Sequence, residues 1–287
     1  MAETVIAARN LRVAYPGFEL KGVTFTMGRG EVLGFIGPNG AGKTTVIRCL
    51  MGIIPTDAGQ VSLFGGERPE LARRRVGFVS DDALPYGVLT TAEAGRLLAP
   101  LYPAWDESRF AGLLADFDIA PGKPIDTLSK GQKVKLSLAL ALARDAELLV
   151  MDEPTSGLDP VFRSELLDLQ YGLIQDERRS VLFSTHITAD IERIADRVLF
   201  IRGGAIVLDE PKDDLLARHC MLKGPADRLG ELADLVVGSR TTGSGFTALS
   251  GIEPGRSVPE GFVREPASLE DIIVYSSRED YRAKPVA

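Results

Sequence analysis

The chain has 287 residues, of which 45% are hydrophobic and 25% are charged, a composition typical of a soluble globular protein with a packed core. Its net charge of -7 argues against a dedicated binder of duplex DNA, because such a binder presents surplus lysine and arginine to the phosphates. The two cysteines lack the spacing of a disulfide framework or a zinc site, so a reducing compartment is expected. We expect neither a secretory signal nor a membrane span, since no run of about 18 apolar residues occurs.

The first half of the chain is predicted to contain strands followed by helices. The strands are predicted at residues 3–15, 23–27, 31–37, 60–65 and 76–80. A helix that buries one face is expected from Lys43 onward. Between about 90 and 118 we expect two helices separated at Pro103, because proline interrupts the hydrogen bonds of a helix.

The second half continues with buried strands and helices. The segment QKVKLSLALALA alternates like a strand, but its length, alanines and leucines favour a helix over 132–143. The remaining elements are strands at 147–152 and 180–185, a hairpin at 197–209, and helices at 160–175 and 187–194. Together they predict an α/β fold: a mostly parallel sheet with helices on both faces, and an antiparallel β part near the N-terminus.

A change of composition after Pro211 suggests two domains. We expect a large domain over 1–211, with a helical insert at about 82–145, and a small accessory domain of α+β type over 212–287. The accessory domain contains a possible strand, FTALSG, and an amphipathic segment, SLEDIIVYSS.

A glycine-rich loop is the strongest functional motif. GPNGAGKT matches the phosphate-loop pattern G-x-x-x-x-G-K-[ST], and it follows an apolar strand and opens a helix, where backbone N–H groups converge on phosphate. We predict a P-loop NTPase core in which Lys43 contacts the β- and γ-phosphates and the Thr44 hydroxyl contacts Mg²⁺. A structural glycine-rich turn is the alternative. The predicted phosphate-binding residues are Gly37, Pro38, Asn39, Gly40, Ala41, Gly42, Lys43, Thr44 and Thr45.

Two other predicted strands end in side chains that suit phosphate chemistry. LLVMDE ends in Asp152 and Glu153, and because successive strand side chains point to opposite sides, the two cannot serve the same purpose. Asp152 suits a place around Mg²⁺, and Glu153 suits polarising the attacking water; alternatively, both acids cap the next helix. His186 follows the strand SVLFST, where a lone histidine is more often structural than functional.

A second candidate anion site is the signature segment LSKGQ, at 128–132. The order GPNGAGKTT, LSKGQ, LLVMDEPTSGLD and STH resembles the nucleotide-binding subunits of ABC transporters, over about residues 3–210. The resemblance implies a head-to-tail dimer that holds ATP and Mg²⁺ between its subunits. The signature residues Ser129, Lys130, Gly131 and Gln132 of one subunit would then lie at the ATP of the other, with the Ser129 side chain and the Gly131 N–H at its γ-phosphate.

The resemblance also implies roles for three further residues. Asp159 would lie at the centre of the dimer interface, His186 would hold the γ-phosphate, and Tyr15 would stack on adenine, for which core packing is an equal alternative. Two positions depart from the family pattern: Lys130 stands where glycine is common, and Asp81 stands where a glutamine usually contacts Mg²⁺. Asp81 can approach Mg²⁺, but it adds negative charge beside the phosphates.

These features predict the ATP-hydrolysing energy subunit of a transporter, resembling those paired with ABC-2-type export permeases. We expect it to be cytoplasmic and peripheral on the inner face of the cell membrane. Its expected partners are a second ATPase subunit, identical or paralogous, and a transmembrane permease; no nucleic acid is expected. Two alternatives are a soluble ABC ATPase acting on nucleic acid, ribosomes or cluster assembly, and a nucleotide-responsive interaction protein with little turnover.

Overall fold

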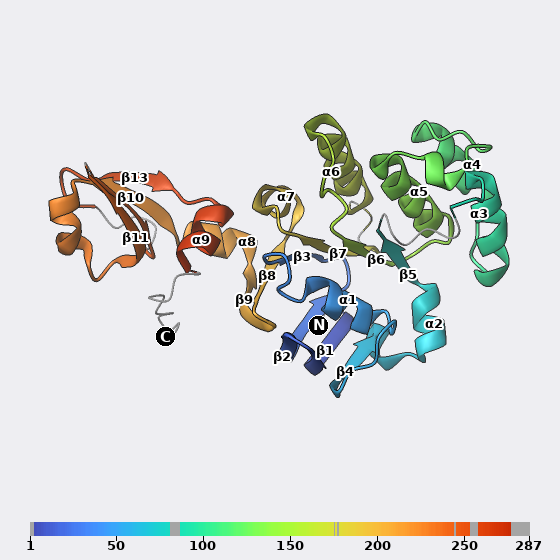
Figure 1. Cartoon of the computed structure of the whole chain (residues 1–287), viewed down its shortest axis with the longest axis horizontal. Coiled ribbons are helices and arrows are strands. Elements are labelled where there is room, and N and C mark those ends of the chain that lie inside the picture. Colours follow the sequence, from blue (N-terminus) through green and yellow to red (C-terminus); the bar gives the residue numbers. More distant parts are fainter. Residues whose placement is uncertain are drawn as a thin grey trace. The chain divides into compact units, whose positions relative to one another are not determined.

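The computed structural model describes residues 3–80, 87–174, 176, 178–243, 245–252 and 258–276. The chain divides into two compact units, of which the first ends at Asp209 and the second begins at Glu210. Each unit is described by itself (Figure 1).

A six-stranded sheet forms the centre of the first unit. Its spatial order is β5-β6-β7-β3-β8-β9, and the paired strands from β5 to β8 run parallel. The strands are β3 (Val32–Ile36), β5 (Val76–Val79), β6 (Leu148–Asp152), β7 (Ser180–Thr185), β8 (Arg197–Arg202) and β9 (Ala205–Pro211). All residues of β3 and β7 are buried, as expected of strands covered on both faces. The predicted parallel sheet is confirmed.

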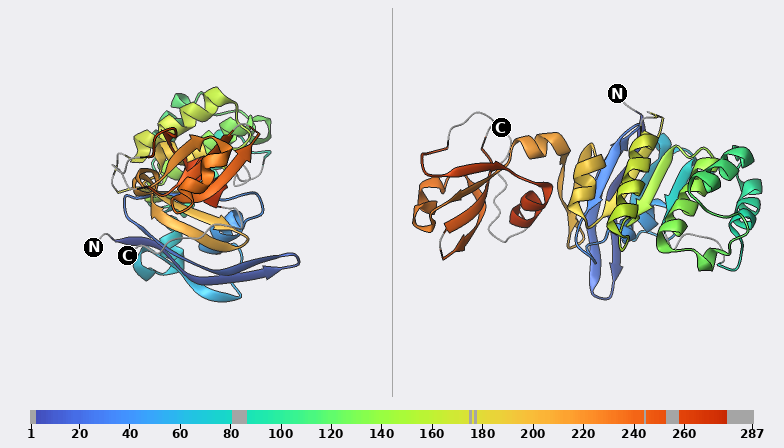
Figure 2. Two further views of the ribbon diagram at one scale, coloured as in Figure 1. Left: turned by 90° about the vertical axis from the view of Figure 1, so that its left-hand side faces the viewer. Right: turned by 90° about the horizontal axis from the view of Figure 1, so that it is seen from above.

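A three-stranded antiparallel sheet packs beside the six-stranded one. It consists of β1 (Thr4–Tyr15), β2 (Phe18–Gly28) and β4 (Ala58–Leu63), in the order β2-β1-β4. Along β2, residues such as Leu20, Phe25 and Met27 are buried and join a core that includes α1 (Lys43–Leu50) and apolar residues of β3. Figure 2 shows β1 and β2 in blue as a long hairpin. The predicted antiparallel part near the N-terminus is confirmed.

Helices cover both faces of the six-stranded sheet, as predicted. Figure 1 shows α1 on one face and α5, α6 and α7 on the other. The helices of that second face are α5 (Lys130–Ala143), α6 (Pro160–Ile174) and α7 (Thr188–Ile194). The ambiguous segment 132–143 is helical, and it is buried over most of its length between α4 (Glu107–Asp116) and β5. A helix of this kind carries apolar residues all round, which explains its strand-like pattern.

The predicted helical region before α5 consists of α3 (Thr91–Leu98) and α4, separated by a short 3₁₀ turn, Ala99–Leu101. The separation near Pro103 is therefore as expected. In this region the structure differs from the prediction at a strand end and contains one further helix. The strand predicted at 60–65 ends at Leu63, because Phe64 and Gly65 adopt positive φ values in a 3₁₀ turn. The helix α2 (Pro69–Arg74) was not predicted at all.

The second unit has an α+β arrangement. Its sheet has the order β11-β12-β10-β13 with antiparallel pairs. The elements are α8 (Lys212–Ala217), β10 (Cys220–Gly224), β11 (Val236–Thr242), β12 (Gly245–Ser250), β13 (Val263–Pro266) and α9 (Leu269–Ser276). Leu222, Phe246 and Ile252 belong to a separate small core. The segment SLEDIIVYSS forms α9, which contacts β11 and β12.

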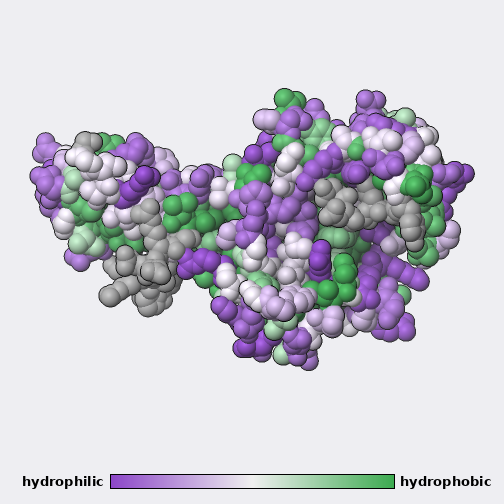
Figure 3. Space-filling view, in the orientation of Figure 1, coloured by the Kyte–Doolittle hydropathy of each residue, from purple (hydrophilic) through white to green (hydrophobic). Residues whose placement is uncertain are grey.

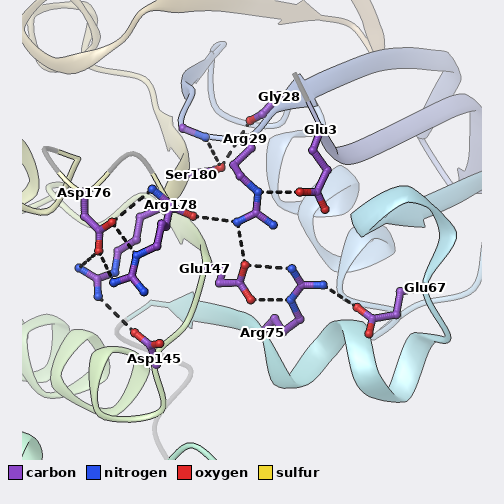
Figure 4. Close-up of polar contacts among 12 residues, drawn as sticks. Glu3, Gly28, Arg29, Glu67, Arg75, Asp145, Glu147, Asp176, Arg178 and Ser180 are labelled. Carbon is purple, nitrogen blue, oxygen red and sulfur yellow. Dashed lines mark hydrogen bonds and ion pairs between the residues drawn. The ribbon is translucent and has the colours of Figure 1, made fainter. Parts of the chain in front are cut away.

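An ion-pair network ties the first unit together around Glu147, the residue immediately before β6 (Figure 4). Arg75 donates to both oxygens of Glu147, at 2.6 and 2.9 Å, and Arg29 donates to Oε2 at 2.7 Å. Arg29 also pairs with Glu3, and Arg75 pairs with Glu67. The Arg75 and Arg29 guanidinium groups lower the pKa of Glu147 to about 2. This carboxylate therefore stays ionised and fixes the start of β6.

The surface is mixed in character. In the view of Figure 3, hydrophilic residues predominate and smaller hydrophobic areas interrupt them. Among the described residues, no helix is both long enough and apolar enough to cross a membrane.

Candidate functional site

The phosphate loop connects β3 to α1 in the middle of the six-stranded sheet. β3 lies between β7 and β8, so the loop opens at the edge where the parallel strands end, which is where such sheets bind ligands. Gly40 and Gly42 have φ values of 77° and 115°, a region that side chains with a Cβ enter only at a cost. A Cβ on Gly42 would also lie 2.8 Å from the Phe18 ring. The backbone itself thus requires glycine at these positions.

A pocket of about 520 Å³ lies against this loop. Most of its lining comes from the loop and the first turn of α1. The lining residues are Gly17, Phe18, Asn39, Gly40, Ala41, Gly42, Lys43, Thr44, Thr45 and Glu153. Backbone N–H groups at the start of a helix favour an anion, so this pocket suits phosphate. Of the predicted phosphate-binding residues, Gly37 and Pro38 are the two outside this lining.

The Lys43 side chain is held inside the loop. It is only 5% exposed, and its Nζ donates to the carbonyl oxygens of Gly37 at 2.6 Å and Pro38 at 3.4 Å. Nζ also lies 3.1 Å from Oε1 of Glu153. Gly37 and Pro38 therefore position the lysine, and a phosphate that binds Lys43 competes with a carboxylate for the same ammonium group.

The two adjacent carboxylates face different partners. Asp152 Oδ1 accepts a hydrogen bond of 2.7 Å from the Ser184 hydroxyl of the neighbouring strand β7. Glu153 lies past the strand end with a φ of 49°, and its N–H donates to the Ser184 carbonyl at 3.0 Å. Its Oε2 is 2.8 Å from Nδ1 of His186. The structure thus brings Lys43, Glu153 and His186 together, whereas Asp152 contacts Ser184.

The donor set at this edge fits a small, hard cation. Thr44 lines the pocket, and Asp152 is the last residue of β6, at the edge where the parallel strands end. Oε1 of Glu153 is buried and faces the Lys43 ammonium, with Nζ 3.1 Å away. In the described part of the chain, no three His, Cys, Asp or Glu side chains cluster to hold a metal. Mg²⁺ suits such a site, because it takes one or two protein oxygens together with substrate phosphates and waters.

The signature segment forms the start of α5. Ser129 is the N-cap: its Oγ accepts from the Gln132 N–H at 3.2 Å, and Gln132 Oε1 accepts from the Ser129 N–H at 3.3 Å. This is a capping box, which satisfies two otherwise free donors. Gly131 faces the Phe162 ring of α6, and a Cβ there would lie 2.4 Å from that ring. None of these signature residues is among the described residues that line the pocket of their own chain.

Asp159 and Lys130 lie on the exposed side of the same region. Asp159 Oδ1 accepts from the N–H groups of Val161 at 3.1 Å and Phe162 at 3.0 Å, so it caps α6. A Cβ on Gly157 would lie 3.8 Å from Lys130 Nζ, which places this lysine beside the turn that leads to Asp159.

The other end of the pocket is lined by residues that were not predicted. Gly17 and Phe18 belong to the β1–β2 turn and line the pocket, whereas Tyr15 is 47% exposed and pairs with Phe18 in the strand register. Core packing of Tyr15 is thus not observed. The sequence did contain a signal for this role of Phe18, namely an aromatic residue directly after the turn glycine Gly17. The predicted Mg²⁺ ligand Asp81 lies outside the described residues.

Sequence comparisons agree with this geometry. Residues 20–156 match the family model described as ABC transporter. An uncharacterized ABC transporter ATP-binding protein of Synechocystis is 33% identical over 66% of the chain, which spans 55% of that protein. A fluoroquinolones export ATP-binding protein of Mycobacterium tuberculosis is 35% identical over 75% of the chain and 73% of its own length. The Nod factor export ATP-binding protein I of Burkholderia lata is 32% identical over 89% of the chain and 90% of its own length.

A solved structure supports the same assignment. The structure of an ATP-binding subunit of an ABC transporter superposes with a TM-score of 0.64 at 29% identity, covering 74% of this chain and 91% of its own. The phosphate loop, the Glu153–His186 contact and the signature helix thus lie in a chain that belongs to the ABC transporter ATP-binding proteins.

Proposed function

We propose that the chain hydrolyses ATP in a Mg²⁺-dependent reaction and that this reaction drives export through a separate membrane permease. The observation that carries the proposal is the direct contact among Lys43, Glu153 and His186 at the mouth of the phosphate loop. A cation, a carboxylate and an imidazole meet there beside helix N–H groups. This set can bind a triphosphate and orient the water that attacks it.

Each residue has a distinct proposed task. Lys43 and the N–H groups at the start of α1 bind the β- and γ-phosphates. Glu153 accepts a proton from the attacking water once ATP has drawn the Lys43 ammonium, 3.1 Å away, from its Oε1. His186 holds the γ-phosphate and fixes the Glu153 carboxylate, with which it is in contact. Phe18 lines the end of the pocket proposed to face the base, and the exposed Tyr15, its partner in the strand register, is the residue proposed to stack on adenine.

Mg²⁺ would be held by the Thr44 hydroxyl, with Asp152 nearby. When bound, the ion neutralises charge that develops on the transferred phosphate. Asp152 is oriented by the Ser184 hydroxyl, and such a hydrogen bond keeps the carboxylate ionised and fixes its direction.

A dimer completes the proposed site. Ser129 and Gly131 lie at a helix N-terminus, the kind of position that binds anions, yet they do not line their own chain's pocket. Their proposed ligand is therefore the γ-phosphate bound by a second ATPase subunit. Two such sites related by a two-fold axis would make ATP part of the interface, so that hydrolysis weakens the dimer.

The helical region is the proposed contact with the permease. Val88, Leu97 and Leu101 are 81%, 47% and 59% exposed there, and exposed apolar side chains of this kind suit a protein interface. The export function is proposed from the relatives named above, two of which are export ATP-binding proteins. Together these proposals place the chain at the inner face of the cell membrane.

An ATPase assay tests the proposal. The purified chain is assayed with Mg²⁺, with a chelator, and with membranes that contain the permease encoded beside it. We expect Mg²⁺-dependent turnover that rises with the permease and depends on protein concentration. The Lys43→Ala variant is the matched background. Turnover no greater than that background under every condition would refute the proposal.

A further inference from the structure

A buried carboxylate lies behind the proposed active site. Asp190, in the first turn of α7, is fully buried, with a relative exposure of 0%. It does not line the pocket, and none of the roles proposed above uses it. A buried charge is costly unless every lone pair is satisfied, so its partners show what it holds in place.

Three segments meet at Asp190. Its Oδ2 accepts a hydrogen bond of 2.6 Å from the Thr155 hydroxyl, and Thr155 is itself only 1% exposed. Its Oδ1 accepts from Arg163, with Nε at 2.7 Å and Nη2 at 2.6 Å. Asp190 thus joins its own helix α7 to the turn after β6 and to α6.

Each of these segments carries a residue of the proposed site. Thr155 comes two residues after Glu153, and α7 begins two residues after His186. Arg163 lies in the first turn of α6, and its N–H donates to the carbonyl of Asp159. One carboxylate therefore connects the segments of Glu153, the proposed general base, of His186, proposed to hold the γ-phosphate, and of the turn expected to face the second subunit.

The Glu153 turn needs such support. Its φ of 49° is unusual for a residue with a side chain, and such a conformation persists only where the surroundings over-determine it. The N–H of Glu153 is held by the Ser184 carbonyl on one side. The Thr155 hydroxyl, held by Asp190, is the anchor on the other side.

We propose that Asp190 is a positioning residue for ATP hydrolysis: through Thr155 and Arg163 it fixes Glu153 relative to His186 and to the Asp159 turn. This inference rests on the proposed function. Directional hydrogen bonds to a buried charge define positions more sharply than apolar packing does. A displacement of the general base of about 1 Å can lower the rate by about a hundred-fold while nucleotide binding persists.

The chain offers a matched control on the same pair of helices. Arg193 of α7 pairs with Asp168 of α6 at 2.5 Å, but Asp168 is 66% exposed and lies more than two helical turns beyond Asp159. Replacing Asp168 removes an ion pair between α6 and α7 without touching the buried network. Exposed ion pairs of this kind contribute little to the free energy of unfolding.

The test compares Thr155→Val, Thr155→Ser, Asp190→Asn and Asp168→Asn for kcat, KM, ATP binding and melting temperature. We expect kcat to fall at least about ten-fold in Thr155→Val and Asp190→Asn, with KM within about two-fold of the unmodified protein. Thr155→Ser restores the hydroxyl and should keep kcat within about three-fold, as should Asp168→Asn.

The outcomes separate this inference from the proposed function. An unmodified chain without ATPase activity would overturn both. An active chain whose folded Thr155→Val variant keeps its kcat, or whose Thr155→Ser variant loses as much as Thr155→Val, would overturn only the role of Asp190. If Asp190→Asn fails to fold, the two Thr155 variants decide the question.

Discussion

The pairing of Lys43 with Glu153 leads to a prediction about ATP affinity. A phosphate that reaches the Lys43 ammonium must displace a carboxylate 3.1 Å away. At an effective dielectric constant of about 20, that attraction is on the order of 5 kcal/mol. Solvation of the separated groups compensates for much of this energy, and Lys43 keeps its hydrogen bonds to the Gly37 and Pro38 carbonyl oxygens. A net cost of about 1–2 kcal/mol remains for ATP to overcome.

Replacing Glu153 with glutamine should therefore strengthen ATP binding while it abolishes most turnover. A gain of about 1–2 kcal/mol corresponds to binding about five- to thirty-fold tighter. Loss of the general base should lower kcat by about a hundred-fold or more. Because bound ATP is then not hydrolysed, the ATP-bound dimer should accumulate when the protein is concentrated.

The assay must separate affinity in one subunit from dimer formation. Fluorescent ATP is titrated into dilute protein whose monomeric state is verified by light scattering, and each variant is measured alone and with Ser129→Ala. We expect the tighter binding of Glu153→Gln to persist in the Ser129→Ala background. Equal or weaker affinity in the monomer would show that the carboxylate does not compete for Lys43, and an unchanged kcat would remove Glu153 from the base role.

Three further predictions concern single positions. Lys43→Ala should abolish binding of labelled ATP, and an affinity within about two-fold of the original would contradict the phosphate-loop assignment. Ser129→Ala should lower turnover strongly yet leave ATP binding by the monomer nearly intact, so a loss of monomer binding would argue against a site shared between subunits. Folding lowers the pKa of Glu147 to about 2, so this group stabilises the fold at pH values above the pKa that it has in the unfolded chain. This contribution is lost as the pH falls from about 4.5 toward 2. Glu147→Gln should thus lower the unfolding free energy in urea by roughly 2 kcal/mol at pH 7, allowing for solvent screening, with the difference shrinking below about pH 4.5.

Much of the fold could be predicted because local patterns and tertiary structure agree in it. The buried runs that became β6 and β7 read as strands, and the alternation of strand and helix indicated a parallel sheet. The helix α2 was missed because a six-residue segment carries too little periodicity to distinguish it from a loop. The end of β4 was misplaced because the positive φ of Phe64 is set by tertiary packing, not by its propensity for strands.

Residues of the candidate site could be predicted where they belong to one short, continuous sequence motif. The glycines of the phosphate loop and the two adjacent acids at the end of β6, Asp152 and Glu153, are of this kind. Phe18 was missed because its place in the pocket depends on how the β1–β2 turn lies against Gly42. Asp190 could not be found from the sequence, since its partner Thr155 is 35 residues away and nothing in either local pattern marks the pair.

The cap at the start of α5 has a consequence for how Ser129 can act. Its oxygen already accepts the Gln132 N–H, so the hydroxyl proton can be donated to a further acceptor, which in the proposed dimer is a phosphate oxygen of the ATP bound by the other subunit. Aspartate would cap the helix equally well, but it would present a negative charge where the proposed phosphate contact needs a hydrogen-bond donor. A single serine hydroxyl can therefore serve both purposes: its oxygen caps the helix, and its proton is donated to the anion.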